Sequence, residues 1–144
     1  MAEIHQSAVV AFSARQMFAL VNDITRYPEF LPWCAKAECL TQTLDVVRAR
    51  LTVAKGGLHY TFTTDNHAQW STQLEMRLVD GPFRRLHGIW QFVDNPLGSK
   101  VSLDLEFEFA NRILATTLSP LFKVVTGSLV NSFKQRAEQL YGQR

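Results

Sequence analysis

The sequence predicts an α+β fold in which a curved, antiparallel, seven-stranded sheet grips one long C-terminal helix, with two short helices after the first strand. Between Cys34 and Phe109, apolar and polar residues alternate with a period of two and short turns interrupt them, which is typical of antiparallel strands with one face in water. After Ser119 and Pro120, apolar residues recur at steps of three and four, which is typical of an amphipathic helix.

The N-terminal segment predicts one strand and then the two short helices. β-branched residues favour a strand over Glu3 to Phe12. Ser13 and Gln16 match a capping box, which begins a helix whose apolar face ends near Asn22. Beyond it, the prolines of the Pro28 to Pro32 segment allow at most a short helix between them.

Six further strands follow from the period of two. They are expected at residues 36–43, 46–54, 58–63, 71–79, 85–92 and 101–109. The last strand is the clearest, because five apolar residues from Val101 to Phe109 face one way and Ser102, Asp104, Glu106 and Glu108 face the other. Glycine- and proline-containing turns separate several of these strands.

The final helix is expected to begin with Ser119 as its N-cap and Pro120 as its first residue, and to end at Tyr141 before Gly142. Residues 112–118 add at most a turn or two before Pro120. Such a helix runs roughly 33 Å and is about 10 Å wide, so it cannot fill the concavity of a seven-stranded sheet.

The space left between sheet and helix is either packed with aromatic side chains or kept as an apolar ligand cavity, and periodicity does not choose between the two. Aromatic and aliphatic residues from the short helices, the sheet and the long helix could converge there. The candidates are Tyr27, Phe30, Leu31, Trp33, Tyr60, Phe62, Phe83, Trp90, Phe92, Phe122, Val125, Leu129 and Phe133.

Length and composition exclude several classes of protein. The chain has 144 residues, 47% of them hydrophobic, and a formal net charge of +2, which fits one domain over residues 1–144 and excludes intrinsic disorder. No apolar run is long enough for stable membrane insertion, and no secretory signal opens the chain, so a cytoplasmic location is expected. Cys34, Cys39 and four scattered histidines do not match a metal centre.

Charge is unevenly distributed along the chain. Residues 1–110 carry 10 basic and 12 acidic side chains, whereas residues 111–144 carry five basic side chains against Glu138 alone, a net charge of +4. A basic C-terminal segment suits an anionic surface such as RNA phosphate, although solubilising charge on an outer helix face explains it equally simply. The contact candidates are Lys123, Lys134 and Arg136, with Arg84 and Arg85 as a second patch.

Catalytic chemistry is poorly supported, and no catalytic residue is predicted. The chain has no nucleophile elbow and no phosphate-binding glycine motif. The carboxylates Asp104, Glu106 and Glu108 lie opposite the apolar row, and His59 and His87 alternate away from it, so all five are expected on the wet face of the sheet. An enzyme of the cyclase or aromatase type is a third hypothesis, which rests on fold precedent alone.

Four segments, residues 21–34, 81–92, 105–109 and 133–142, together resemble the coenzyme Q-binding, polyketide cyclase-like branch of the START superfamily. The run Tyr27-Pro28-Glu29-Phe30-Leu31-Pro32-Trp33-Cys34 is the most specific of these matches. The resemblance covers nearly the whole chain in order. It implies the helix-grip fold, which the order of the elements predicts independently.

The resemblance implies one of two activities. Bacterial members of the branch are toxins that bind the large ribosomal subunit and block its joining to the small subunit, in some cases with an antitoxin protein as partner. Mitochondrial relatives bind ubiquinone in a hydrophobic tunnel and support respiration. We therefore expect a binding protein with no required cofactor and no DNA partner, which contacts the ribosome or carries ubiquinone or another isoprenoid lipid.

Overall fold

The seven strands form a single antiparallel sheet in the order β1-β7-β6-β5-β4-β3-β2, which confirms the predicted fold class. The computed structural model describes residues 2–127 and 129–142. The elements are β1 (Ala2–Val10), α1 (Ala14–Asn22), the 3₁₀ helix η1 (Ile24–Glu29), β2 (Cys34–Gln42), β3 (Val46–Lys55), β4 (Leu58–Gln69), β5 (Gln73–Asp80), β6 (Phe83–Asn95), β7 (Gly98–Phe109), α2 (Arg112–Gly127) and α3 (Leu129–Tyr141).

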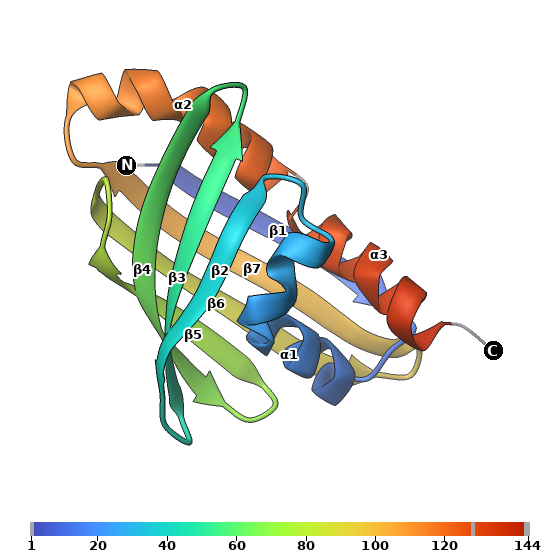
Figure 1. The fold of residues 1–144 in the computed structure, drawn as a ribbon. Helices are drawn as coiled ribbons and strands as arrows, with labels where there is room; N and C mark the ends of the chain where they lie inside the picture. Colours follow the sequence, from blue (N-terminus) through green and yellow to red (C-terminus); the bar gives the residue numbers. More distant parts are fainter. Residues whose placement is uncertain (1, 128, 143–144) are drawn as a thin grey trace.

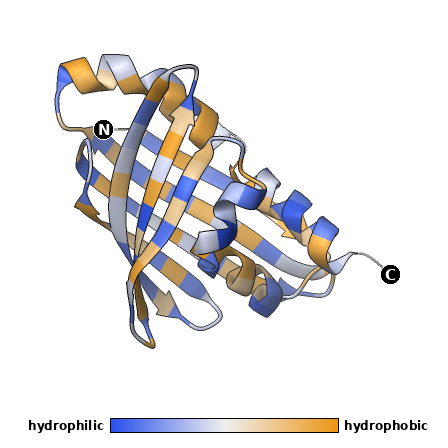
Figure 2. Cartoon of the chain, in the orientation of Figure 1, coloured by the Kyte–Doolittle hydropathy of each residue, from blue (hydrophilic) through white to orange (hydrophobic). Residues whose placement is uncertain are grey.

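The sheet curves around the C-terminal helices, and α1 and η1 lie on the same side (Figure 1). Hydrophobic and hydrophilic residues form alternating stripes along the strands (Figure 2). The pairing of β6 with β7 sets Trp90 opposite Leu103 and Phe92 opposite Val101, and all four side chains are buried. The concave face of the sheet and the inner faces of the helices therefore share one hydrophobic core.

Helix α1 begins as predicted. The Gln16 amide donates to Ser13 Oγ at 3.1 Å, and the Ser13 amide donates to Gln16 Oε1 at 2.9 Å, which completes the capping box. The second short helix is η1, which ends at Glu29, so most of it precedes the segment between Pro28 and Pro32. Pro28 fits inside this 3₁₀ turn, and Pro32 disfavours helical backbone at the residue before it.

The prediction of one C-terminal helix that begins at Pro120 is wrong, because two helices, α2 and α3, follow β7. Helix α2 already begins at Arg112, where Asn111 Oδ1 accepts from the Leu114 amide at 2.8 Å, so Asn111 acts as the cap. Ser119 therefore lies inside the helix, and its hydroxyl donates to the Ala115 carbonyl. Pro120 follows without ending the helix.

The chain bends by 40° between α2 and α3. Strand β1 bridges this joint through one side chain: Gln6 Nε2 donates to the Thr126 carbonyl, and Gln6 Oε1 accepts from the Val130 amide at 3.1 Å. The amide therefore satisfies one carbonyl at the end of α2 and one N–H at the start of α3. Among the described residues no single helix is long and apolar enough to span a membrane, although α2 and α3 taken together pass that test by length and composition.

Several strand boundaries differ from the expected ones for local reasons. Strand β4 continues to Gln69 rather than ending at residue 63, because its inner face carries the polar residues Thr64 and Asn66 there and the apolar alternation is lost. Strand β5 begins at Gln73, since the Thr72 amide donates to the Gln69 carbonyl at 2.8 Å and closes a turn. Strand β1 ends at Val10, two residues before the predicted end.

Candidate ligand cavity and basic surfaces

A cavity of about 80 Å³ lies between the concave face of the sheet and helices η1, α2 and α3. Many of the residues expected to converge there lie on its wall. They are Tyr27, Trp33, Phe62, Trp90, Phe122, Val125, Leu129 and Phe133. Sheet, short helix and both C-terminal helices thus contribute to one aromatic-lined space.

The other candidates lie away from this wall. Phe83 stacks on Phe109 with ring centroids 5.0 Å apart, and Phe92 stacks on Trp90 with centroids 6.3 Å apart. Leu31 and Tyr60 are buried in the core, and Phe30 lines grooves on the outer side of α3. These five residues therefore do not line this cavity: four belong to the packed core, and Phe30 lies at the outer grooves.

The cavity has a polar side that the sequence pattern does not reveal. Asn66 is 4% exposed and lines the cavity beside Thr64, whose hydroxyl donates to Asn66 Oδ1 at 2.8 Å. Among the described residues no hydrogen bond uses the Asn66 amide nitrogen. This nitrogen is not among the buried atoms that lack a partner, so it is accessible from the cavity, where a ligand oxygen or a water molecule would accept a hydrogen bond from it.

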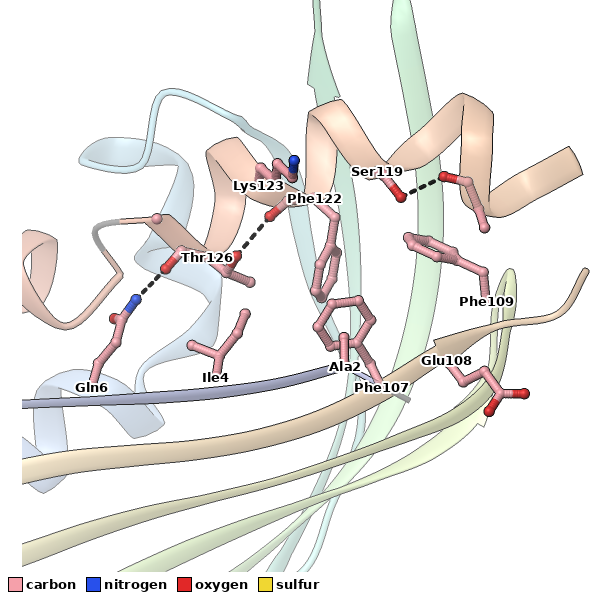
Figure 3. Close-up of a pocket in the computed structure, with 12 residues that line it drawn as sticks. Ala2, Ile4, Gln6, Phe107, Glu108, Phe109, Ser119, Phe122, Lys123 and Thr126 are labelled. Atoms are coloured by element: carbon pink, nitrogen blue, oxygen red, sulfur yellow. Dashed lines mark hydrogen bonds between the residues drawn. The ribbon is translucent and has the colours of Figure 1, made fainter. Parts of the chain in front are cut away.

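A larger, open groove of about 670 Å³ lies next to the cavity, between β1, β7 and α2 (Figure 3). Its wall is mainly apolar and includes Ile4, Phe107 and Phe109. Phe122 and Thr126 line both the groove and the cavity, so their side chains form the partition between the two spaces. The Phe122 ring packs against Phe107 with centroids 4.3 Å apart, which holds this partition closed.

Buried titratable groups in the core are kept neutral. Burial raises the pKa of the Cys34 thiol to about 11, so this cysteine is not an activated nucleophile at neutral pH. Burial also raises the pKa of Tyr60, whose hydroxyl has no hydrogen-bond partner, and that of Tyr27, whose hydroxyl donates to the Val21 carbonyl. None of these groups is poised for acid–base or nucleophilic chemistry at neutral pH.

The predicted wet face of the sheet carries the charged and histidine pairs. Asp104 accepts from His5 at 2.6 Å in a well-exposed pair, and this hydrogen bond raises the pKa of His5. His87 lies 2.6 Å from Glu75 Oε2, and this contact lowers the pKa of that carboxyl. Within the part of the chain that the structure describes, no group of three or more metal-ligating side chains could hold an ion.

The five basic candidates do not share one exposed surface. Arg84 pairs with Glu108 at 2.9 Å, and Glu108 lines the same groove as Lys123. Arg136 lies on the other side, only 14% exposed, where Nη2 donates to Glu29 Oε1 at 2.6 Å. Arg136 therefore fixes α3 to η1 rather than projecting into solvent.

The remaining positions add little to a common surface. Arg85 is exposed at the start of β6, and Lys134 is half-buried on α3. His59 is exposed on β4, as predicted. Arg144, which contributes to the C-terminal charge of +4, lies outside the described residues.

Comparison with known proteins identifies the family. A family model described as polyketide cyclase/dehydrase and lipid transport matches residues 10–134. The chain belongs to this family. A START superfamily protein from Mycobacterium smegmatis has the same fold, with a TM-score of 0.79, 22% identity, and coverage of 96% of this chain and 98% of that one. The helix-grip fold is thus confirmed.

Two curated relatives are similar over nearly the whole chain. The ribosome association toxin RatA of Pseudomonas aeruginosa is 47% identical over 142 residues, which cover 96% of this chain and 97% of the relative. The mitochondrial coenzyme Q-binding protein COQ10 homolog B of Xenopus laevis is 27% identical over 147 residues, which cover 99% of this chain and 60% of that protein. An aromatase/cyclase from Streptomyces sp. R1128 shares the fold at a TM-score of 0.78 and 16% identity.

Proposed function

We propose that this chain is a ribosome-associating protein that binds the large subunit and blocks its joining to the small subunit. The observation that carries the proposal is full-length similarity, at 47% identity, to a relative named ribosome association toxin RatA. A binding role rather than catalysis is supported by the neutral, buried state of Cys34, Tyr27 and Tyr60. We propose the cytoplasm as its location and an antitoxin protein as a further partner.

Sedimentation tests this function. The purified chain is mixed with isolated large subunits, small subunits or both, and is run on sucrose gradients at low salt. We expect co-sedimentation with the large subunit and a smaller peak of joined ribosomes. Binding should weaken steeply as salt rises, because contacts to phosphate release condensed counterions. If the chain stays at the top of every gradient at low salt, the proposal is wrong.

A second candidate function is the binding of ubiquinone or another isoprenoid lipid, which would serve as a bound ligand rather than a required cofactor. The specific support is the aromatic cavity with its unpaired Asn66 amide, next to the apolar groove beside Phe122. The cavity alone, at about 80 Å³, is small, so a lipid tail would occupy the groove. Burial of that tail contributes about 25 cal/mol per Å² of apolar surface.

The lipid hypothesis is tested by native mass spectrometry of the gently purified chain and by organic extraction. Added ubiquinone should raise the melting temperature of the wild-type chain. An Asn66→Leu variant should lose most of this shift, because it removes the donor for a ligand carbonyl while keeping the side-chain volume similar. Recovery of no lipid, together with no shift in the wild-type chain, would exclude the hypothesis.

A further inference from the structure

A second groove, of about 540 Å³, lies on the opposite side of the C-terminal helices from the apolar one. One wall is a stripe of α3, and the other is the end of β3. The floor comes from the segment between η1 and β2. The lining residues are Phe30, Pro32, Trp33, Ala54, Lys55, Val124, Ser132, Gln135, Arg136 and Gln139.

The groove is rigidly built from parts distant in sequence. The Trp33 carbonyl accepts from the Ala54 amide at 2.9 Å, which ties the floor to the end of β3. The Arg136 guanidinium lies 5.0 Å above the Phe30 ring centroid and is held there by Glu29. Phe30 also packs against Phe133 with centroids 5.3 Å apart. The floor is therefore held in place before any ligand binds.

The groove lining combines apolar, amide and positively charged side chains. It carries two cations, Lys55 and Arg136, and no carboxylate, while Glu29 neutralises Arg136 from outside the lining. Lys55 is exposed and makes no ion pair with another described residue. The amides of Gln135 and Gln139 lie one helical turn apart on the same wall, and both residues are exposed. A hydrophobic floor, two amides and one available ammonium group thus surround one space.

We propose that this groove holds a single unstacked nucleotide of RNA. The base lies against Phe30 and Pro32, the amides of Gln135 and Gln139 bond to its edge, and Lys55 pairs with its phosphate. Proteins recognise RNA mainly through splayed bases that stack on flat side chains and bond along their edges, with cations on the backbone. The assignment rests on the proposed ribosome association, for which it supplies a contact point.

Nucleotide titration tests the groove without the ribosome. Adenosine, cytidine, guanosine and uridine 5′-monophosphates are added in turn to isotope-labelled protein. At least one should shift the side-chain amide signals of Gln135 and Gln139 and the indole N–H signal of Trp33, with Gln91 on the outer face of β6 as an unmoved control. If none of the four nucleotides moves these signals, or if Gln91 moves equally, the assignment is overturned.

A pair of charge variants tests the groove on the ribosome. Lys55→Gln should weaken binding to large subunits and to protein-free ribosomal RNA about 3- to 5-fold, as expected for one exposed charge pair. It should also reduce the slope of log affinity against log salt by about 0.7, the value for one phosphate contact on a single strand. Lys100→Gln removes the same charge from the outer face of β7 and should change both quantities less.

The outcomes separate the two proposals. If the wild-type chain binds large subunits but Lys55→Gln behaves like Lys100→Gln, the groove is not the RNA site and the ribosome function stands. If Lys55→Gln weakens binding to intact subunits but not to protein-free RNA, the groove contacts a ribosomal protein and the nucleotide assignment is wrong. If nucleotides bind the groove but no subunit co-sediments with the wild-type chain, the ribosome function fails alone.

Discussion

Gly98 opens β7 with a backbone φ of +146°, a conformation that residues with a side chain rarely adopt. A Cβ atom at this position would lie 2.7 Å from the carbonyl carbon of Ala11, part of the backbone that leaves β1. Gly57 offers a contrast, since its φ is +85° and a Cβ there would meet nothing within 4 Å. Alanine variants at the two glycines therefore distinguish the cost of backbone strain alone from that of strain together with a steric clash.

We expect Gly98→Ala to lower the free energy of unfolding by about 2–4 kcal/mol, since strain and a backbone clash add. Gly57→Ala should cost only about 1 kcal/mol, from strain alone. Urea unfolding followed by circular dichroism measures both. Equal losses of stability in the two variants would show that the close approach of β7 to the end of β1 does not add to the cost of a side chain at Gly98.

Tyr27 and Tyr60 form a matched pair of buried phenols that differ in one hydrogen bond. Tyr27→Phe removes the bond to the Val21 carbonyl and should destabilise the fold by about 0.5–1.5 kcal/mol. Tyr60→Phe removes a hydroxyl that has no partner and should be neutral or slightly stabilising. Thermal unfolding of both variants decides the point, and a loss of stability in Tyr60→Phe would mean that its hydroxyl has a partner in solution.

At the scale of the elements, the joint between α2 and α3 depends on Gln6 of β1. Gln6→Ala should lower the free energy of unfolding by about 1–2 kcal/mol, because it removes two hydrogen bonds. The two backbone groups that lose their partner then bond to water instead. Hydrogen exchange should speed up at the Val130 amide in particular. Ser7→Ala, one residue along on the outer face, is the control, and equal exchange rates in both variants would contradict a role for Gln6.

Elements defined by local signals are predicted from the sequence, whereas those set by distant contacts are not. The capping box at Ser13 and Gln16 places α1, and the alternation of β7 places its inner face. The bend before α3 involves a side chain more than 100 residues away, at Gln6, and the second half of β4 has the polar residues Thr64 and Asn66 on its inner face. Neither feature gives an apolar periodic pattern in the sequence.

The candidate site divides in the same way. Large aromatic residues are recognisable by type, and several, such as Trp90 and Phe133, do line the cavity. Type alone does not separate them from Phe83 and Phe92, which belong to solid core. Asn66 lies on the same alternating face of β4 as Tyr60 and Phe62, but it is polar and lies beyond residue 63, where the strand was expected to end, so the residue pattern does not single it out.

For the whole molecule, the largest side chain in the partition between cavity and groove is Phe122, which forms it together with Thr126. Phe122→Ala should join the two spaces and lower the free energy of unfolding by about 3–5 kcal/mol, as for other large-to-small changes in a core. It should also increase the fluorescence of a bound apolar dye. Phe109→Ala is the matched control, because Phe109 lines the groove alone. Equal dye binding by the two variants would mean that Phe122 does not close the cavity.

The pairing of the first strand with the last has a consequence for synthesis. Strand β1 pairs only with β7, with Ala2 opposite Phe107, so it has no partner until about 100 further residues have been made. At about 5–20 residues per second, that leaves the strand waiting for several seconds or longer. The sheet therefore closes only after β7 has been made, and until then the edge of β1 that pairs with β7 is open to other strands or to chaperones.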